Sequence, residues 1–307
     1  MIKIAVGVSS CLLGEHVRYD GGHRRDSYIV GTLGKVFELV LFCPEVAIGL
    51  GVPRPMLKLI RSNIGLQCVG ADDGSLNVTD RLRAYANEQK PAHSGLSGYI
   101  FKKGSPSCGV EKVRVVINGA PDGFGTGIYA DQLRINFPLM PMEEEGRLGN
   151  LEIRENFLQR VRIFHRWKAL EKTELSRKNL TEFHNQHKLI VMSHDQDECR
   201  KLGRLLTANR KVNIGNIAQE YVELLMRVLK KIATRENHVK VLQHLLSYLN
   251  TVLSKEDKVE LSDTIDGYLN EELPLIAPIT LLKHHFRKNP DPYVEQSFYM
   301  SPYPDTE

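Results

Sequence analysis

The chain has 307 residues, of which 42% are hydrophobic and 25% are charged, and its formal net charge is +4. This composition is typical of an ordinary soluble globular protein, and the length allows two domains of about 100–200 residues each. No apolar run approaches the roughly 20 residues that a membrane-spanning helix needs, and the N-terminus lacks the features of a signal peptide. These properties predict a cytoplasmic protein.

Up to about residue 145, short apolar segments alternate with glycine, proline and helix-like stretches. Apolar runs predict strands over five segments, namely 2–8, 37–46, 64–70, 97–104 and 112–119. Between them, 26–37 and 79–89 predict helices, the second with Thr79 or Asp80 as its N-cap. Strands that alternate with helices indicate a Rossmann-like, layered α/β domain with a mostly parallel sheet. In such folds ligands bind outside the carboxyl ends of the strands.

A change of composition follows this region. Residues 138–150, PLMPMEEEGRLGN, are rich in proline, acid and glycine, which indicates a boundary or linker. From there on, apolar residues recur at three- and four-residue spacing, which predicts an all-α domain. The proline-rich tail from Asn289 onward predicts an extended segment along the surface. We therefore expect an α/β domain at 1–145 and an all-α domain at 146–307.

Five cysteines, an odd number in a chain without an export signal, argue against a disulfide framework. Cys11, Cys43 and Cys108 each follow a predicted strand and lie beside Gly, Ser or Pro. Three thiols at strand ends of one sheet are able to converge on one point, where backbone N–H groups face the sulfur atoms. Cys68 and Cys199 lie within apolar or helical patterns and fit small core residues. Spacing alone leaves open whether the first three are ligands or core residues as well.

Two other interpretations of these cysteines are open at this point. Cys11 with His16 or His23 resembles a thiol nucleophile with its base, although no third orienting residue is evident. A zinc ion bound by the three thiols is the second interpretation, and metal analysis separates it from iron.

Four ordered motifs resemble those of a known family. SSCLLGEHVRYDG, CPEVAIGLGVPRP, KKGSPSCGV and the later GTGIYA are similar to the motif set of the thiouracil desulfidase (TudS) family, over roughly the first half of the chain. The helical half, with FHNQHKLIVMSHD, resembles the YbgA domain, which is often fused behind a TudS-like domain. One departure is Ile48, which stands where the family pattern has a glycine.

The resemblance implies a 4Fe-4S cluster held by Cys11, Cys43 and Cys108, with one iron left without a protein ligand. An open coordination position suits a soft thiocarbonyl sulfur atom. The implied activity is a non-redox desulfidation, in which a thiolated pyrimidine or thionucleotide is converted by water into its oxo form and hydrosulfide. The expected partner is therefore a small thiolated molecule, with no membrane involved.

Polar residues near the cysteines complete the expected site. Glu45, two residues after Cys43, is the candidate general acid or base, with helix capping as its alternative role. Ser105 is the second catalytic candidate, either as a substrate-positioning or proton-relaying group or as an ordinary turn serine. The candidates for substrate binding are Arg54, Lys102, Ser107 and Tyr19. The cations among them suit an anionic group such as a nucleotide phosphate, with surface solvation as the alternative for the lysine.

The helical half offers weaker signals. His184 and His187 lie at i and i+3 of a predicted helix and fit either a metal site or buried, hydrogen-bonded histidines. The densest basic stretch, RVRIFHRWK at 160–168, is typical of a solvated helix face, with nucleic-acid binding as the alternative. The alternative function of the chain is thus a cluster-based redox or regulatory protein whose helical domain contacts nucleic acid.

Overall fold

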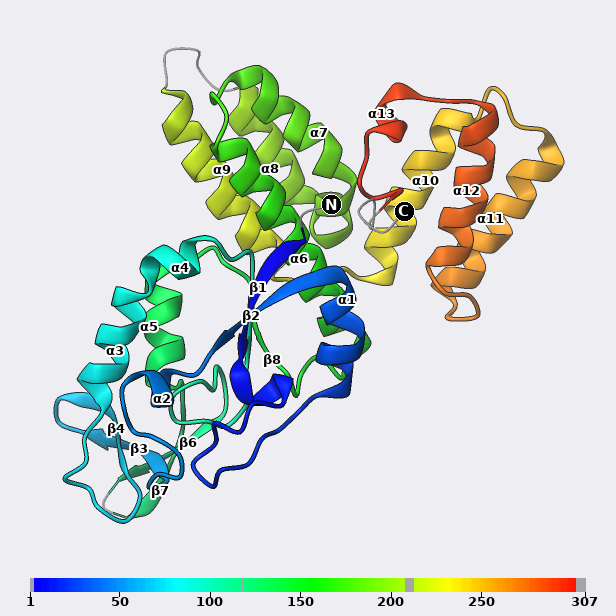
Figure 1. Ribbon diagram of the computed structural model, residues 1–307. Coiled ribbons are helices and arrows are strands. Elements are labelled where there is room, and N and C mark those ends of the chain that lie inside the picture. Colours follow the sequence, from blue (N-terminus) through cyan, green and yellow to red (C-terminus); the bar gives the residue numbers. More distant parts are fainter. Residues whose placement is uncertain (1–2, 118, 208–212, 302–307) are drawn as a thin grey trace. The chain divides into compact units, whose positions relative to one another are not determined.

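The computed structural model describes residues 3–117, 119–207 and 213–301 of the chain (Figure 1). It divides into two compact units, Met1–His165 and Arg166–Glu307. Among the described residues, the first unit, called the α/β unit below, contains all the strands, and the second, called the helical unit, contains helices alone, which confirms the predicted fold class. The division falls inside helix α6 (Leu151–Glu171), and the predicted border at residue 145 stays a prediction. Within the described residues, no helix combines the length and the apolar character that crossing a membrane requires.

The α/β unit is built on a parallel four-stranded sheet in the order β2-β1-β5-β8. Its strands are β1 (Ile4–Ser9), β2 (Phe37–Phe42), β5 (Tyr99–Phe101) and β8 (Met142–Glu144). Because β2, β1 and β5 are parallel neighbours, their carboxyl ends meet at one edge of the sheet. Any loop that leaves these three strands therefore starts at the same edge.

Both faces of this sheet are buried, as expected for a parallel sheet covered on two sides. Val6 and Ile100 pack into one core, whereas Tyr99 and Phe101 point into the core on the opposite face. Strand β1 needs a glycine at position 7, because a Cβ atom there would lie 2.4 Å from the ring of Tyr99. The glycine in VGVSSC thus lets β1 and β5 lie close together.

Strand β8 lies within the stretch predicted to be a linker. Residues 142–144 pair in parallel with β5, with Met142 opposite Tyr99, and form the edge of the sheet. The acidic composition of this stretch does not reflect exposure, because Glu143 and Glu144 are buried. The linker prediction is therefore wrong for these residues.

A second four-stranded sheet has the order β4-β3-β6-β7. Its strands are β3 (Leu57–Ser62), β4 (Gly65–Gly70), β6 (Val113–Ile117) and β7 (Ala120–Gly125). Strands β3 and β6 are parallel, and each forms an antiparallel hairpin with its neighbour in sequence. The sequence predicts β4 and β6 but not β3 and β7, which contain charged, proline or glycine residues.

Short helices connect the strands of the α/β unit. They are the 3-10 helix Ser10–Leu13, the π-helix Ile29–Leu33 with α1 (Gly34–Val36), α2 (Pro44–Ala47), α3 (Thr79–Glu88), α4 (Lys90–Ser94) and α5 (Ile128–Asn136). Helices α3 and α5 pack against each other (Figure 1). The predicted N-cap of α3 is wrong, because Val78 holds that position and Thr79 Oγ1 accepts the N–H of Cys68 at 2.9 Å.

The helical unit continues from α6 with α7 (Arg177–His194), α8 (Gln196–Thr207), α9 (Ile214–Leu229), α10 (Arg235–Leu249), α11 (Lys255–Leu269), α12 (Ile276–Lys288) and α13 (Pro292–Glu295). Side-chain caps begin several of these helices, as at Ser176 and Ser254. The tail is less extended than predicted, because it forms α13 and buries Tyr299 and Met300. Residues 302–307 of the predicted tail lie outside the described residues.

The basic stretch 160–168 is not a solvated face throughout. Arg160 and Arg162 are buried, and the guanidinium of Arg162 lies 5.4 Å from the ring centre of Phe37. The expectation of solvated arginines is wrong at these two positions, because the aliphatic stems of arginine pack well in apolar surroundings.

Candidate metal centre

Three cysteine side chains line one cavity of about 500 Å³ in the α/β unit. Cys11 lies in the 3-10 helix after β1, Cys43 follows β2 directly, and Cys108 lies in the loop after β5. The carboxyl ends of these strands meet at one edge of the sheet, so the fold brings together thiols that are far apart in the sequence. The structure therefore places the predicted ligands in the walls of a common cavity.

The spacing of these thiols differs from that of a site for a single ion. Among the described residues, no three His, Cys, Asp or Glu side chains lie close enough together to hold one metal ion. Thiolates around one zinc ion each lie about 2.3 Å from it. The three thiols therefore line a common cavity without the close grouping that one bound ion requires.

Burial raises the pKa of all three thiols. It raises the pKa of Cys11 to about 11 and raises that of Cys108 well above the usual range, where Glu45 and the other two cysteines add to the effect. Burial also raises the pKa of Cys43, although the backbone N–H groups of Val46 and Glu45 oppose this. The thiols are thus protonated at neutral pH unless a cationic centre stabilises the thiolates.

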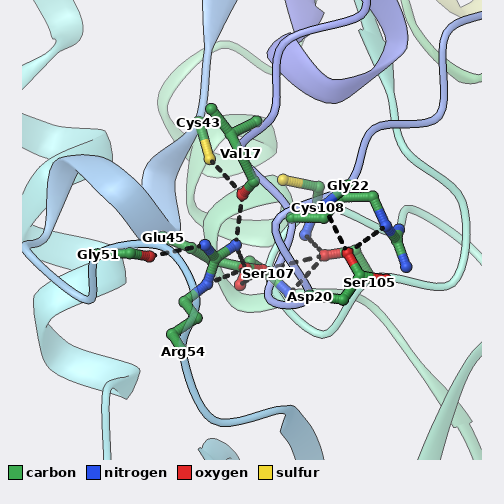
Figure 2. A network of polar contacts seen from close by, with 11 residues as sticks. Val17, Asp20, Gly22, Cys43, Glu45, Gly51, Arg54, Ser105, Ser107 and Cys108 are labelled. Atoms are coloured by element: carbon green, nitrogen blue, oxygen red, sulfur yellow. Dashed lines mark hydrogen bonds and ion pairs between the residues drawn. The ribbon is translucent and has the colours of Figure 1, made fainter.

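Glu45 is held at the cavity by a network of polar contacts (Figure 2). Its Oε2 atom accepts a hydrogen bond from Nε of Arg54 at 3.0 Å and a second one from the terminal nitrogen of the same side chain. Its Oε1 atom accepts hydrogen bonds from the hydroxyl of Ser107 at 2.8 Å and from that of Ser105 at 3.4 Å. The carboxylate is therefore fixed in orientation beside two of the cysteines.

Arg54 is committed to contacts inside the protein. Besides Glu45, its guanidinium donates to the carbonyls of Gly51 at 3.0 Å and Val17 at 2.9 Å. Only 3% of its side chain is exposed. The carbonyl of Val17 also accepts a hydrogen bond from the Cys43 thiol at 3.9 Å, so Arg54 and Cys43 share a partner. Its predicted role in binding an anionic group stays a prediction.

Ser105 and Ser107 have different positions around this carboxylate. Ser105 lines the cavity, and its hydroxyl oxygen accepts the N–H groups of Ser107 at 3.3 Å and Cys108 at 3.2 Å. Ser107 is fully buried behind Glu45. The turn SPSC thus uses one serine to hold the backbone that carries Cys108 and both serines to hold Glu45.

Lys102 and Tyr19 line the cavity, as do several other basic residues. Lys102 forms an ion pair with Glu145, and its backbone N–H donates to Ser9 at 3.0 Å. The remaining basic side chains of the wall are Arg18, Lys58, Lys103, Lys112 and Arg114. Among the described lining residues Glu45 is the one carboxylate, so the cavity favours an anionic occupant.

Glu144 at the end of β8 and Glu145 directly after it hold both ends of the loop that carries Cys108. Glu145 accepts the backbone N–H of Lys103 at 2.6 Å. Glu144 accepts the N–H groups of Val110 at 2.6 Å and Glu111 at 3.2 Å. The sequence does not predict these two glutamates as part of the site, because the acidic stretch that contains them indicates a linker.

Gly127, in the GTGIYA motif, supports the same loop from below. A Cβ atom at this position would lie 2.6 Å from the carbonyl carbon and oxygen of Ser107 and 2.8 Å from the N atom of Cys108. Helix α5 begins directly after it, and the N–H groups of Tyr129 and Ala130 donate to the Ser107 carbonyl at 3.0 and 3.1 Å. The motif thus supports the backbone of the Cys108 loop. The amino-acid sequence of the motif alone does not predict this role.

The other candidate residues are placed outside this centre. His16 and His23 stack on each other edge to face, with ring centres 4.9 Å apart, whereas the charged groups near Cys11 include Lys102 and Arg18. Cys68 is buried in the core on β4, and Cys199 is buried on α8, as expected for small core residues.

His184 and His187 are buried and hydrogen-bonded, which matches the non-metal interpretation. His187 donates from Nδ1 to the Phe183 carbonyl at 2.7 Å, and His184 Nδ1 is bonded to the Tyr221 hydroxyl at 3.1 Å. Burial lowers the pKa of His184 to about 4 and that of His187 to about 3, so both are neutral at pH 7.

Comparison with known proteins connects this site to a family. Residues 6–145 match the family model of the 2-thiouracil desulfurases, and residues 188–304 match a family described as a protein of unknown function, DUF1722. The uncharacterized protein YbgA of Escherichia coli (strain K12) is 29% identical over 147 residues, which are 47% of this chain and 87% of that protein. The resemblances predicted from the motifs are thereby confirmed.

A solved structure also resembles part of the chain. It is described as the [4Fe-4S]-dependent thiouracil desulfidase TudS and is 32% identical in sequence, covering 48% of this chain and 94% of its own. The TM-score is 0.38, so the superposition by itself establishes no common fold.

Proposed function

We propose that this chain, which belongs to the 2-thiouracil desulfurase family through residues 6–145 and carries a DUF1722 region at 188–304, removes sulfur from thiolated pyrimidines or thionucleotides. One molecule of water replaces the thiocarbonyl sulfur by oxygen, the sulfur leaves as hydrosulfide with one proton of that water, and the other proton is released to solvent. The observation that carries this proposal is the meeting of three cysteines and one fixed carboxylate around a single cavity within the family segment.

The cofactor in this proposal is a 4Fe-4S cluster held by Cys11, Cys43 and Cys108. The residues fit such a group for two reasons. The donors are thiols, which suit iron–sulfur clusters, and all three line one cavity of about 500 Å³. When bound, a cluster with one iron lacking a protein ligand supplies a Lewis acid that polarises a C=S group.

Glu45 is the residue to which we assign proton transfer. Replacing sulfur by oxygen requires that a proton leave the attacking water molecule and that a proton reach the departing sulfur. Arg54 fixes Oε2 of the carboxylate, whereas the contacts of Oε1 with the described residues are two serine hydroxyls, which are able to rotate. Oε1 is therefore the oxygen atom that we expect to take and return the proton.

The supporting residues hold and orient these groups. Arg54 and Ser107 act as positioning residues for Glu45, since both contact its carboxylate and are buried. Ser105 also lines the cavity, and we assign to it the orientation of a substrate. Tyr19 and Lys102 line the same cavity, and the basic side chains of its wall favour a substrate that carries a negative charge.

Release of hydrosulfide from 4-thiouracil, 2-thiouracil and 4-thiouridine monophosphate under anaerobic conditions tests the proposal. Glu45→Gln should lower the rate about 10²–10⁴-fold while the iron content stays that of the native protein. Glu38→Gln, an exposed glutamate on β2, is the matched control and should leave the rate unchanged. The proposal fails if none of the three compounds releases sulfide, and the role of Glu45 fails if its variant keeps the native rate.

A further inference from the structure

The helical unit contains a cavity of its own, of about 520 Å³, formed by α7, α8 and α10. This volume lies within the range of small-molecule sites. Its walls include two helical stripes, one of residues 184, 188 and 192 on α7 and one of residues 196, 200 and 204 on α8, with His244 of α10 facing them. None of the residues proposed for the desulfidation reaction lines this cavity.

The charge of the cavity wall has one sign. Lys188, Arg200 and Arg204 are cationic, and none of the described residues that line the cavity is acidic. Arg200 is paired with Asp197 at the exposed rim. Lys188 has its amine 5.7 Å from the ring centre of Tyr293. Cations that converge on a concave surface are the usual means of binding a phosphate group.

Two further observations point to a ligand in this cavity. The Nε2 atom of His244 is buried and has no hydrogen-bond partner among the described residues, although a buried polar atom normally has one. Gly203 lies in the middle of α8, where a glycine is less favourable than alanine. A Cβ atom at 203 would meet Nε2 of His184 at 3.7 Å, an ordinary contact, so packing does not require the glycine.

We infer that this cavity binds a phosphate group, carried by inorganic phosphate or by a small nucleotide. Lys188, Arg200 and Arg204 hold the phosphate, and His244 donates or accepts one hydrogen bond on the inner side. A small molecule fits these observations better than a nucleic acid, because the cations line a cavity that also contains the half-buried imidazole of His244. The source of the phosphate is either inorganic phosphate or a nucleotide.

Isothermal titration of the full chain with inorganic phosphate, with adenosine monophosphate and with a uridine decamer tests this inference at low salt. Adenosine monophosphate is chosen because its purine base differs from the pyrimidine proposed for the α/β unit. Binding of phosphate or of the nucleotide supports the inference, and the tighter of the two identifies the source. Failure of both to bind overturns it, as does binding of the decamer alone.

Variants locate the binding. Arg204→Gln should weaken it about tenfold or more, since hydrogen bonds to a charged group are among the stronger ones. Gly203→Leu fills the cavity and should abolish binding, whereas Gly203→Ala should retain it and slightly raise the unfolding temperature. Arg227→Gln, an exposed arginine of α9 outside the cavity wall, should leave the affinity unchanged. Full binding in Gly203→Leu would place the ligand elsewhere and contradict the inference.

Fluorescence gives an independent readout, because Trp167 is the single tryptophan of the chain. Its ring stacks on Tyr221 with 5.9 Å between centres, and the hydroxyl of Tyr221 is bonded to His184 in the cavity wall. Ligand binding should therefore change the tryptophan emission with the same affinity that calorimetry gives. An unchanged emission at saturation would contradict binding at this cavity.

Discussion

In the α/β unit the buried charged side chains contact one another and the backbone of the loops around the cysteines, whereas in the helical unit buried histidines bond to single neighbours. Glu45 and Arg54 form a buried pair, and Glu144 accepts two backbone N–H groups beside Cys108. His184 and His187, by contrast, are neutral and bond to a hydroxyl and a carbonyl. Buried charge thus accompanies loops that must be held in place for chemistry, and buried neutral histidine accompanies packing.

This difference has an energetic reason. A buried charge is costly unless it is paired and hydrogen-bonded, so it is found where several partners are fixed at once. A buried neutral imidazole needs only one or two hydrogen bonds, and it is lost as a stabilising group once it becomes protonated. We therefore expect changes in the α/β unit to affect the site more than the fold, and acid to affect the fold of the helical unit.

The largest effect is expected from Gly127→Ala. The added methyl group would overlap the backbone of Ser107 and Cys108, which cannot move aside without displacing the Cys108 thiol. We predict loss of most of the bound iron and of sulfide release, while circular dichroism still shows a folded chain. Gly31→Ala is the control, because nothing lies within 4 Å of a Cβ atom there. Equal iron contents in the two variants would show that the close contact between Gly127 and the Cys108 loop is not needed for iron binding.

A smaller effect is expected from Glu144→Gln. Removing the charge weakens the hydrogen bonds to Val110 and Glu111, each of which is worth about 1.5–3 kcal/mol when its acceptor is charged. The loop should then open more often, and a chelator should remove iron about ten times faster than from the native protein. Glu152→Gln, an exposed residue of α6, should behave like the native protein. An unchanged chelation rate would show that Glu144 is not needed to hold the Cys108 loop.

The smallest effect at neutral pH, and one that grows with acid, concerns the histidines of the helical unit. Burial lowers the pKa of His184 and His238 to about 4 and that of His187 to about 3, whereas histidine in an unfolded chain titrates near 6.5. The unfolded state therefore binds more protons between pH 6.5 and about 4. Stability is fully present above pH 6.5 and falls as the pH is lowered, by about 1.4 kcal/mol per pH unit for each histidine.

Urea unfolding at pH 7 and pH 5, followed by the emission of Trp167, measures this dependence in the helical unit. His187→Gln should reduce the pH slope by the share of one proton, and the exposed His284→Gln should leave it unchanged. The α/β unit has His93 as a buried histidine of the same kind, bonded to Tyr129 at 2.8 Å. An unfolding free energy that is equal at both pH values would remove the contrast between the two units.

Much of the site could be predicted from the sequence because it follows from strand ends. Cys11, Cys43 and Cys108 each come after an apolar run, and parallel neighbouring strands end at one edge of a sheet. The resemblance of four motifs then adds Glu45 and Ser105. The helices of the second unit follow from apolar periodicity in the same way, since each buries one face.

Other features could not be predicted, because they depend on pairing between distant segments. In the sequence, Glu144 and Glu145 lie in a stretch that is typical of a linker. They reach the Cys108 loop because β8 pairs with β5. Arg54 was expected to face a substrate, yet its donors are used by Glu45 and by carbonyls far away in the chain. The basic cavity of the helical unit likewise requires three helices to be brought together. In each case the missing information is which segments become neighbours.

The most direct test of the central claim is the iron and acid-labile sulfide content of protein purified without oxygen. We predict a full four-iron complement in the native chain and in Cys68→Ser, and loss of the cluster in each of the variants Cys11→Ser, Cys43→Ser and Cys108→Ser. Cys68 is the matched control because it is buried in the same unit, in the core behind Ser107. Full iron content in Cys108→Ser, or a native chain that binds no iron, would contradict the account.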